Sequence, residues 1–154
     1  MRYLVTLCII SFFSFLQGQE SNIPKVFTLG ESEQAYESLN QAYSKTLLEA
    51  TNGDIKTAFD QWLNMMKEMD RYAEDINYDL NGAKIWLHVF WAANGKIDHI
   101  GYLLRSDSKN INEDELKAFF SSFMNRYTFP IKADKPFNHY TGATFPTFSV
   151  KVTN

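Results

Sequence analysis

The chain has 154 residues and a net charge of −3, and 45% of its residues are hydrophobic. This length and composition suit one domain with a substantial apolar core. Nucleic-acid binding is not expected, because the chain is mildly acidic and shows no basic stripe.

Residues 1–18 have the pattern of an export signal. Arg2 gives a short positive start, an almost wholly apolar run extends from Tyr3 to Leu16, and Gln17-Gly18 ends it with a small residue. The run is shorter than the roughly 20 residues that a membrane-spanning helix needs. We therefore expect cleavage before Gln19, no stable membrane span afterwards and a periplasmic or secreted location. An uncleaved anchor is the alternative.

The only cysteine of the chain, Cys8, lies inside this apolar run and follows Leu7. A bacterial lipoprotein needs a small residue directly before its lipidated cysteine, so lipidation is not expected. After cleavage the chain would contain no cysteine, and an oxidising compartment would add no disulfide to it. The fold must then depend on its apolar core.

An extended lead-in and two helices are predicted before the first long strand. Residues 19–31 have no clear periodicity, and Pro24 and Gly30 interrupt them. Residues 32–80 show two helical patterns that are separated by the turn residues Asn52-Gly53. Because the connection is short, the two helices are predicted to form an αα-hairpin of antiparallel neighbours.

Both predicted helices carry apolar residues at spacings of three and four, and Ser32 and Asp54 are their predicted N-caps. The second stripe is rich in aromatic residues and methionine. A ligand-binding surface is one interpretation, but methionine also fills gaps between packed elements, and we favour core packing. The stripes are Ala35, Tyr36, Leu39, Tyr43, Leu47 and Ala50, then Ile55, Phe59, Trp62, Met66, Met69 and Ala73.

A β-hairpin is predicted for residues 84–104, where two apolar segments flank Asn94-Gly95. This dipeptide suits a two-residue type I′ turn, in which both central residues need positive φ. Period-two geometry then places one apolar set on the core face. The predicted pairs are Trp91 with Asp98, Val89 with Ile100, Leu87 with Tyr102 and Ile85 with Leu104.

The opposite face of the hairpin is the first candidate binding site, and it carries Trp86, His88, Phe90 and His99. A strand face open to water normally has more charged residues. We therefore expect either the αα-hairpin or a partner, such as a second copy of the chain, to cover it. His88 and His99 are diagonal neighbours, but a metal would need further ligands. Because the sequence places no such ligand there, no metal site is predicted.

A capped helix and a last strand are predicted after the hairpin. Asn112 and Glu115 match a capping box, and Pro130 stops the helix. Residues 132–143 are expected to form a polar loop, and the run 138–144 is either a connector or a binding loop.

The last strand is predicted from Phe145 to Val152, and it is the second candidate binding site. An exposed edge strand accepts an extended peptide by strand addition. The candidate residues of this edge are Phe145, Thr147 and Phe148.

No catalytic motif is found in the sequence. It contains no serine in a nucleophile-elbow pattern, no phosphate-binding loop and no HExxH zinc motif. The acidic clusters fit helix starts and solvated surfaces, where carboxylates are ordinarily found. We therefore expect no enzymatic activity and no cofactor.

The order of hairpin, helix and strand over residues 84–152 resembles the C-terminal domain of TonB-like periplasmic proteins. The resemblance implies a bacterial envelope protein whose sheet has an open edge. The chain lacks the long Pro-rich linker of the energy-transducing members, so their action on outer-membrane transporters is not carried over. The matching pieces are Asn94-Gly95-Lys96, Ser106-Asp107-Ser108, Asn112 to Leu116, Phe129-Pro130 and Phe145 to Phe148.

The predicted fold is therefore α+β, with an αα-hairpin at 32–80 followed by a ββαβ unit at 81–154 that contains a small antiparallel sheet. The expected function is that of an exported, non-catalytic module that binds an envelope protein or peptide. A self-associating structural domain, present as a homodimer, is the main alternative. An unrecognised enzyme or a metal-binding protein is a weaker one.

Overall fold

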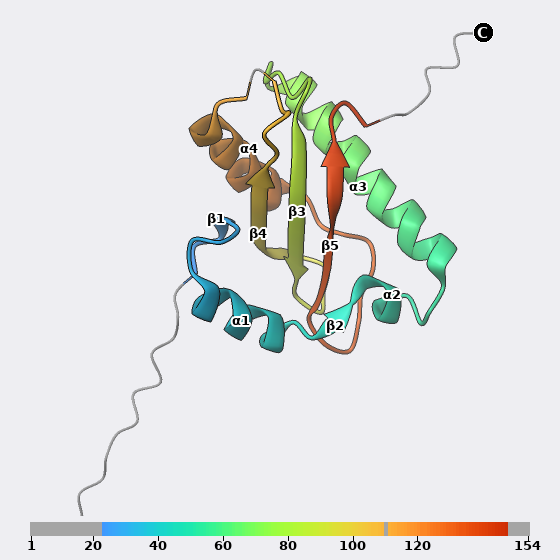
Figure 1. Ribbon diagram of the computed structural model, residues 1–154. Coiled ribbons are helices and arrows are strands. Elements are labelled where there is room, and N and C mark those ends of the chain that lie inside the picture. Colours follow the sequence, from blue (N-terminus) through green and yellow to red (C-terminus); the bar gives the residue numbers. More distant parts are fainter. Residues whose placement is uncertain (1–22, 110, 148–154) are drawn as a thin grey trace, which may run out of the picture.

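The computed structural model describes residues 23–109 and 111–147, which form a mixed α+β structure around one five-stranded sheet (Figure 1). The predicted signal peptide lies outside the described residues. The elements are β1 (Val26–Thr28), α1 (Glu33–Ala42), β2 (Lys45–Thr46), α2 (Leu47–Ala50), α3 (Ile55–Asp75), β3 (Lys84–Trp91), β4 (Ile97–Leu104), α4 (Glu113–Arg126) and β5 (Phe137–Thr144).

The sheet has the strand order β1-β4-β3-β5-β2, with β3 at its centre. β3 runs antiparallel to β4 on one side and to β5 on the other along its whole length. The two short outer strands pair in parallel, β1 with β4 and β2 with β5. The central three strands are therefore antiparallel, and the edges make the sheet mixed.

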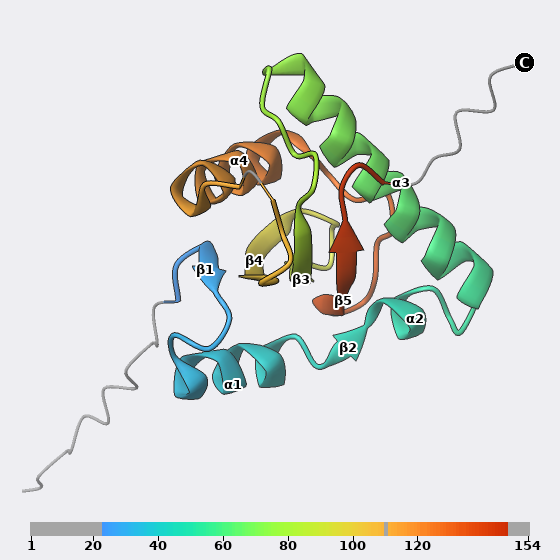
Figure 2. The same ribbon diagram turned by 45° about the horizontal axis from the view of Figure 1, so that its top comes forward.

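Helices lie on both faces of the sheet (Figure 2). α3 and α4 cover one face, where their aromatic residues and methionines pack on β3 and β4 in the larger apolar cluster. α1 lies on the other face, where Ala35 and Leu39 pack against Phe90 in a smaller cluster. Because β3 contributes to both clusters, its alternate side chains are buried on both faces.

The register of the β3–β4 hairpin is as predicted over most of its length. Val89 pairs with Ile100, Leu87 with Tyr102 and Ile85 with Leu104. The prediction is wrong at the turn, where Trp91 pairs with Ile97 and a bulge follows Phe90.

The turn between β3 and β4 differs from the predicted type I′ turn. Gly95 has a φ of +86°, whereas Asn94 is not among the residues with positive φ. The Gly95 amide donates to the Ala92 carbonyl at 2.9 Å, and the Ala92 amide donates to the Lys96 carbonyl at 2.9 Å. These bonds fit a type I turn that is followed by a glycine bulge. The additional residue accounts for the shifted pairing of Trp91.

The predicted αα-hairpin at 32–80 is wrong, because its first helix is two helices that lie apart. α1 ends at Ala42, Lys45 and Thr46 pair with β5, and α2 begins at Leu47. Thr46 and Glu49 form a capping box that starts the new helix. The predicted stripe is divided accordingly: Leu39 packs on one face of the sheet and Leu47 belongs to the cluster on the other.

The predicted last strand at 145–152 is also wrong over the described residues. The strand is β5, which occupies the segment expected to be a loop or connector, and its partner along the whole length is β3. Phe137 anchors it, because this ring is buried and stacks on Trp91 with centroids 5.1 Å apart. Phe145 is buried beyond the end of the strand.

The hairpin turn is held against the segment after α4. The Phe129 amide donates to the Gly95 carbonyl at 2.9 Å, and a Cβ atom at Gly95 would lie 2.2 Å from the Phe129 carbonyl oxygen. A side chain at this position would therefore clash with backbone, in addition to the strain of its positive φ.

We predict that Gly95→Ala lowers the free energy of unfolding by about 2 kcal/mol or more, from positive-φ strain and steric overlap together. Gly53→Ala is the matched control, since Gly53 also has positive φ but its Cβ would meet nothing within 4 Å. Urea denaturation of both variants would measure the difference. Equal losses in the two variants would contradict a steric role for the Gly95 contact.

Candidate functional site

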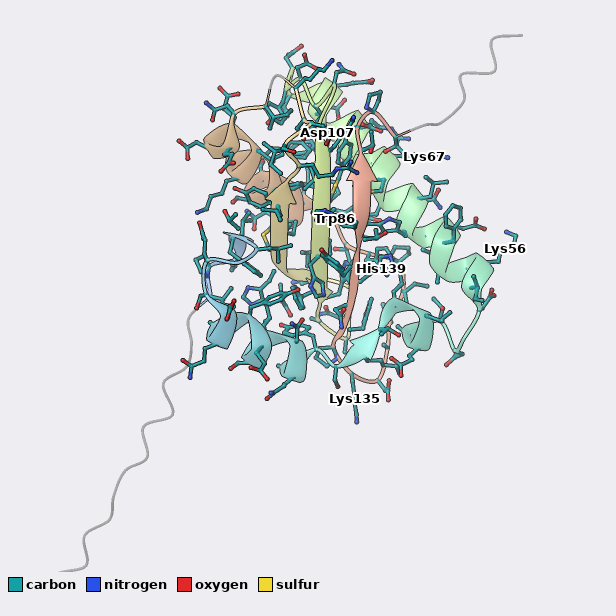
Figure 3. The ribbon with its side chains drawn as sticks, viewed as in Figure 1. Lys56, Lys67, Trp86, Asp107, Lys135 and His139 are labelled. Carbon is teal, nitrogen blue, oxygen red and sulfur yellow. The ribbon has the colours of Figure 1, made fainter. Side chains whose placement is uncertain are left out.

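The first candidate site, the aromatic–histidine face, is only partly covered. α1 buries Phe90 completely and leaves His88 only 5% exposed, whereas Trp86 is 40% exposed. Trp86 lies toward the Asp107 end of the sheet, away from α1 (Figure 3). The single helix α1, and not the expected αα-hairpin, covers the lower half of this face.

His88 is held as a neutral ring between α1 and β5. The Asn138 side-chain amide donates to the carbonyl oxygens of Tyr43 and Lys45, so its Oδ1 is left to accept from His88 Nε2 at 2.9 Å. His88 Nδ1 then accepts from the Tyr36 hydroxyl at 2.7 Å. Both ring nitrogens are therefore occupied, and His88 has no free lone pair for a metal.

His99 is held separately from His88. Its Nδ1 donates to the Pro24 carbonyl at 3.2 Å, and its ring meets Tyr43 edge-on at 6.2 Å. Within residues 23–109 and 111–147, no group of three or more His, Cys, Asp or Glu side chains is placed to hold a metal ion.

The uncovered end of this face carries a small aromatic patch formed by Trp86, Leu103 and Tyr140. Trp86 stacks on Tyr140 with centroids 5.8 Å apart, and its ring lies over Gly142.

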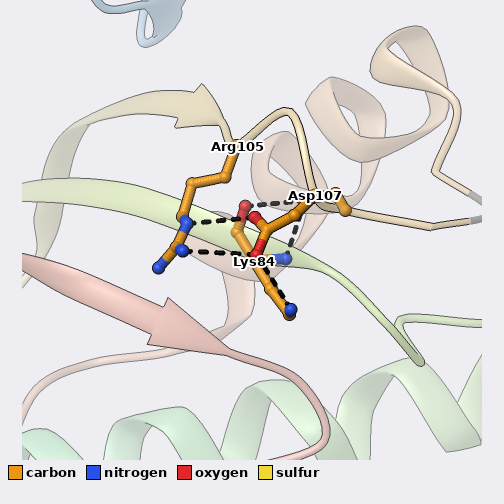
Figure 4. A network of polar contacts seen from close by, with 4 residues as sticks. Lys84, Arg105 and Asp107 are labelled. Carbon is orange, nitrogen blue, oxygen red and sulfur yellow. Dashed lines mark hydrogen bonds and ion pairs between the residues drawn. The ribbon is translucent and has the colours of Figure 1, made fainter.

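Beside this patch, Asp107 accepts from both Lys84 and Arg105, as Figure 4 shows. The hydrogen bond from Lys84 is the main cause of the lowered pKa of the Asp107 carboxyl. Ser108 closes the network, accepting from the Lys84 amide and donating to the Lys84 carbonyl. The network joins the loop after β4 to the start of β3.

An apolar hollow lies on the other side of β5, beside α3. α3 begins beyond β5 (Figures 1 and 2), so Ile55 and Phe59, which start its predicted core stripe, are 72% and 61% exposed. One hollow of about 340 Å³ lies between α2, α3 and His139, and another of about 400 Å³ continues along β5. Phe59, Trp62 and His139 line both hollows, so we treat them as one groove, the β5 groove.

The floor of the β5 groove is aromatic. His139 meets Trp62 with ring centroids 4.6 Å apart, and Trp62 in turn meets Trp91 edge-on at 6.4 Å. Figure 3 places His139 on β5, between the strand and the start of α3. The remaining lining residues are Thr46, Leu47, Leu48, Ile55, Ala58, Leu63, Met66, Thr141, Gly142, Ala143, Thr144 and Thr147.

The edge of β5 above this groove is open. β2 pairs only with Phe137 and Asn138, and residues 139–144 have no strand neighbour on that side within the part of the chain that the structure describes. The Phe145 amide donates to the carbonyl of Ala83, directly before β3, at 2.8 Å. Because peptide groups alternate in direction along an antiparallel strand, those of Tyr140, Gly142 and Thr144 point away from β3.

Two of the predicted edge residues do not lie on this edge. Phe145 is buried and its amide donates to Ala83, directly before β3, and Thr147 follows the strand. Phe148 lies outside the described residues. The sequence analysis missed both the edge itself, which is β5, and the groove residues Phe59 and Trp62. The exposure of Phe59 has no signal in the sequence, because its spacing matches the buried stripe.

A third hollow lies between α3 and α4 and is polar. Glu68 accepts from Arg71 at 2.7 Å there, and the Arg126 guanidinium lies 4.5 Å from the centre of the Tyr72 ring. Burial raises the pKa of Tyr127 to about 12, so this hydroxyl stays protonated at neutral pH. These contacts join the two helices.

Comparison of the chain with protein-family models, curated proteins and solved structures finds no match. Among the helices of residues 23–109 and 111–147, none combines the length and the apolar character needed to cross a membrane.

We predict that the protein loses stability on acidification, because burial lowers the pKa of His88 and His139 below 6.5. The unfolded chain takes up protons below about pH 6.5 while the folded histidines stay neutral, so their contribution is complete above that pH and declines below it. Each histidine accounts for at most about 1.4 kcal/mol per pH unit.

Urea denaturation across this pH range would measure the dependence. Replacing both residues, His88→Gln and His139→Gln, should flatten it. An unchanged pH dependence in the double variant would contradict the assignment to these two rings.

Proposed function

We propose that the protein is an exported bacterial envelope protein whose non-catalytic role is to bind an extended peptide segment of a partner protein. The partner segment adds to the outer edge of β5 as a further strand. The observation that carries this proposal is the open edge of β5 directly above the apolar β5 groove.

The edge supplies the main-chain part of the recognition. The peptide groups of Tyr140, Gly142 and Thr144 offer donors and acceptors to an incoming strand, and such bonds form with any sequence. β2 already uses the same edge at its lower end, where it pairs with Phe137 and Asn138. The edge is therefore of a kind that accepts a neighbouring strand.

The groove supplies selectivity. Successive side chains of an added strand point to opposite faces, so every second side chain would face α3. There it would meet Phe59 and Trp62, which together with His139 offer an apolar surface next to the edge. The preferred partner segment is thus extended, with aliphatic or aromatic residues at alternate positions.

Two features support the envelope setting. The first is the export pattern at residues 1–18. The second is the resemblance of residues 84–152 to TonB-like C-terminal domains, in which a hairpin is followed by a helix and a strand, and the order β3, β4, α4 and β5 is compatible with it.

We predict that an acetylated heptapeptide with valine at alternate positions and threonine or lysine between them binds the β5 groove. An NMR titration should shift the amide signals of Tyr140, Gly142 and Thr144. Phe59→Lys should weaken binding by at least about tenfold, because it puts a charge on the apolar surface.

The matched control for this experiment is Ile76→Lys. Ile76 is exposed at the other end of α3 and is not among the residues that line the groove. Equal weakening by both substitutions, or peptide-induced shifts confined to another surface, would count against the β5 groove as the binding site.

A homodimer is the second proposal, and it rests on the uncovered aromatic patch of Trp86, Leu103 and Tyr140. If a second copy covers this patch, sedimentation equilibrium at micromolar concentration should show a dimer that Trp86→Glu dissociates. A monomer, or a dimer that Trp86→Glu leaves intact, would remove this proposal and leave peptide binding unaffected.

A further inference from the structure

The two hollows of the β5 groove lie at different ends of the open edge. The first, of about 340 Å³, lies beside α2, which follows β2 directly, and we call it the α2 hollow. The second, of about 400 Å³, continues along β5 as far as Thr147, and we call it the strand hollow. Apart from the shared Phe59, Trp62 and His139, the α2 hollow is lined by Thr46, Leu47, Leu48, Ile55 and Ala58, and the strand hollow by Leu63, Met66, Thr141, Gly142, Ala143, Thr144 and Thr147.

The walls of the two hollows differ in polarity. The α2 hollow adds aliphatic side chains to the shared rings, and its one hydroxyl, on Thr46, already donates to the Glu49 carboxylate in the capping box. The strand hollow instead contains three threonines. No lysine, arginine, aspartate or glutamate is among the described residues that line either hollow. The α2 hollow is therefore the more apolar of the two.

The short strand β2 determines where the free part of the edge begins. β2 pairs with Phe137 and Asn138, and the chain then turns into α2 at Leu47. An added strand can therefore begin or end opposite His139, but it cannot extend past this residue without displacing β2. Neighbouring strands lie about 4.8 Å apart, and opposed side chains share a face of the sheet. The side chain opposite His139 consequently points toward α3, as the His139 ring does.

The position opposite His139 faces the α2 hollow. His139 lines this hollow and meets the Trp62 ring with centroids 4.6 Å apart. Leu47, the residue directly after β2, lines the hollow too and is only 1% exposed, so the space beside α3 already accepts a side chain that arrives from this edge. The next groove-facing position of an added strand lies opposite Thr141, which lines only the strand hollow.

The α2 hollow has room for an aromatic ring. An apolar cavity of about 150 Å³ holds one benzene molecule, and the α2 hollow has about 340 Å³. A valine side chain would leave most of this space unfilled, and unfilled apolar space forfeits packing contacts. The rings of Phe59, Trp62 and His139 favour an aromatic occupant further, because aromatic pairs gain more than their buried area alone provides.

The strand hollow makes no such demand. It extends along β5 from His139 to Thr147, so two or more side chains of an added strand share its volume. Aliphatic side chains therefore suffice opposite Thr141 and Ala143.

We propose that the α2 hollow is an anchor pocket for one aromatic side chain of the partner segment, carried at the position opposite His139. This inference rests on the proposed function, since the segment is held at the β5 edge as an added strand. The anchor also fixes the register of the added strand, because a shift by two residues would move the ring out of the α2 hollow.

The test compares the acetylated valine heptapeptide with three versions of it that each carry one phenylalanine. Phenylalanine replaces the first, the last or an inner valine. The two end positions allow for both directions of the added strand, and the inner position is the control. In NMR titrations of the full chain, we expect one of the end-substituted peptides to bind at least about tenfold more tightly than the all-valine peptide. The inner substitution should change the affinity little.

Two variants of the protein separate the hollows. Ala58→Leu enlarges a side chain that lines only the α2 hollow, and Ala143→Leu makes the same change in the strand hollow. The quantity compared is the ratio of the affinities for the end-substituted and the all-valine peptides. Ala58→Leu should lower this ratio to about one, because it fills the space that the ring requires, whereas Ala143→Leu should leave the ratio unchanged. A ratio that survives Ala58→Leu would overturn the inference.

Intermolecular nuclear Overhauser effects on the unsubstituted protein make the test independent of how the variants fold. The ring protons of the bound anchor should contact the methyl groups of Leu48 and Ile55, which line only the α2 hollow. Ring contacts to Leu63 and Met66 instead, which line only the strand hollow, would overturn the inference.

The two proposals fail in different ways. If all four peptides bind equally and shift the amides of Tyr140, Gly142 and Thr144, the anchor pocket is excluded and the proposed function stands. If the end-substituted peptide contacts Leu48 and Ile55 without shifting those three amides, strand addition is excluded and the α2 hollow stands as a pocket for an aromatic side chain.

Discussion

The pairing of β3 with β4 on one side and with β5 on the other is the constraint on which the rest of the structure depends. Because β3 is paired along both edges, every helix must find its place on one of its two faces. α3 and α4 fill one face with aromatic rings and methionines, and α1 fills the lower part of the other. The surfaces that remain exposed are therefore the parts of the sheet that neither these helices nor the neighbouring strands cover.

Two such surfaces remain, and they differ in kind. The patch around Trp86 is a side-chain surface that the short α1 does not reach. The β5 edge has free peptide groups, and the start of α3 adds an apolar wall beside it because it extends past the sheet. The second surface combines a strand direction, free hydrogen-bonding groups and an apolar groove, which is why we propose it as the peptide-binding site.

The sequence predicted what local patterns determine. The alternation in β3 and β4 predicted their register, and Asp54 and Asn112 cap their helices as expected. It did not predict features decided by distant parts of the chain. β5 also contains Asn138 and Gly142, which are residue types depleted in strands, and its pairing depends on Phe137, which stacks on Trp91, and on the edge that β3 offers.

The same limit explains why the sequence did not predict Phe59 as a residue of the candidate site. The spacing of Phe59 fits the buried stripe of α3, and only the position of that helix relative to β5 shows that the side chain is exposed. Thr46 and Glu49, by contrast, form a capping box at the break between α1 and α2. The spacing of these two residues is a local signal that was not used to predict the break.

The most direct test of peptide binding at β5 is a set of intermolecular nuclear Overhauser effects between the heptapeptide and the protein. Strand addition predicts close contacts from the peptide backbone to Tyr140, Gly142 and Thr144, and from alternate valine methyl groups to the rings of Phe59 and Trp62. Contacts confined to Trp86 and Leu103, or contacts to side chains without any to the β5 backbone, would contradict the account.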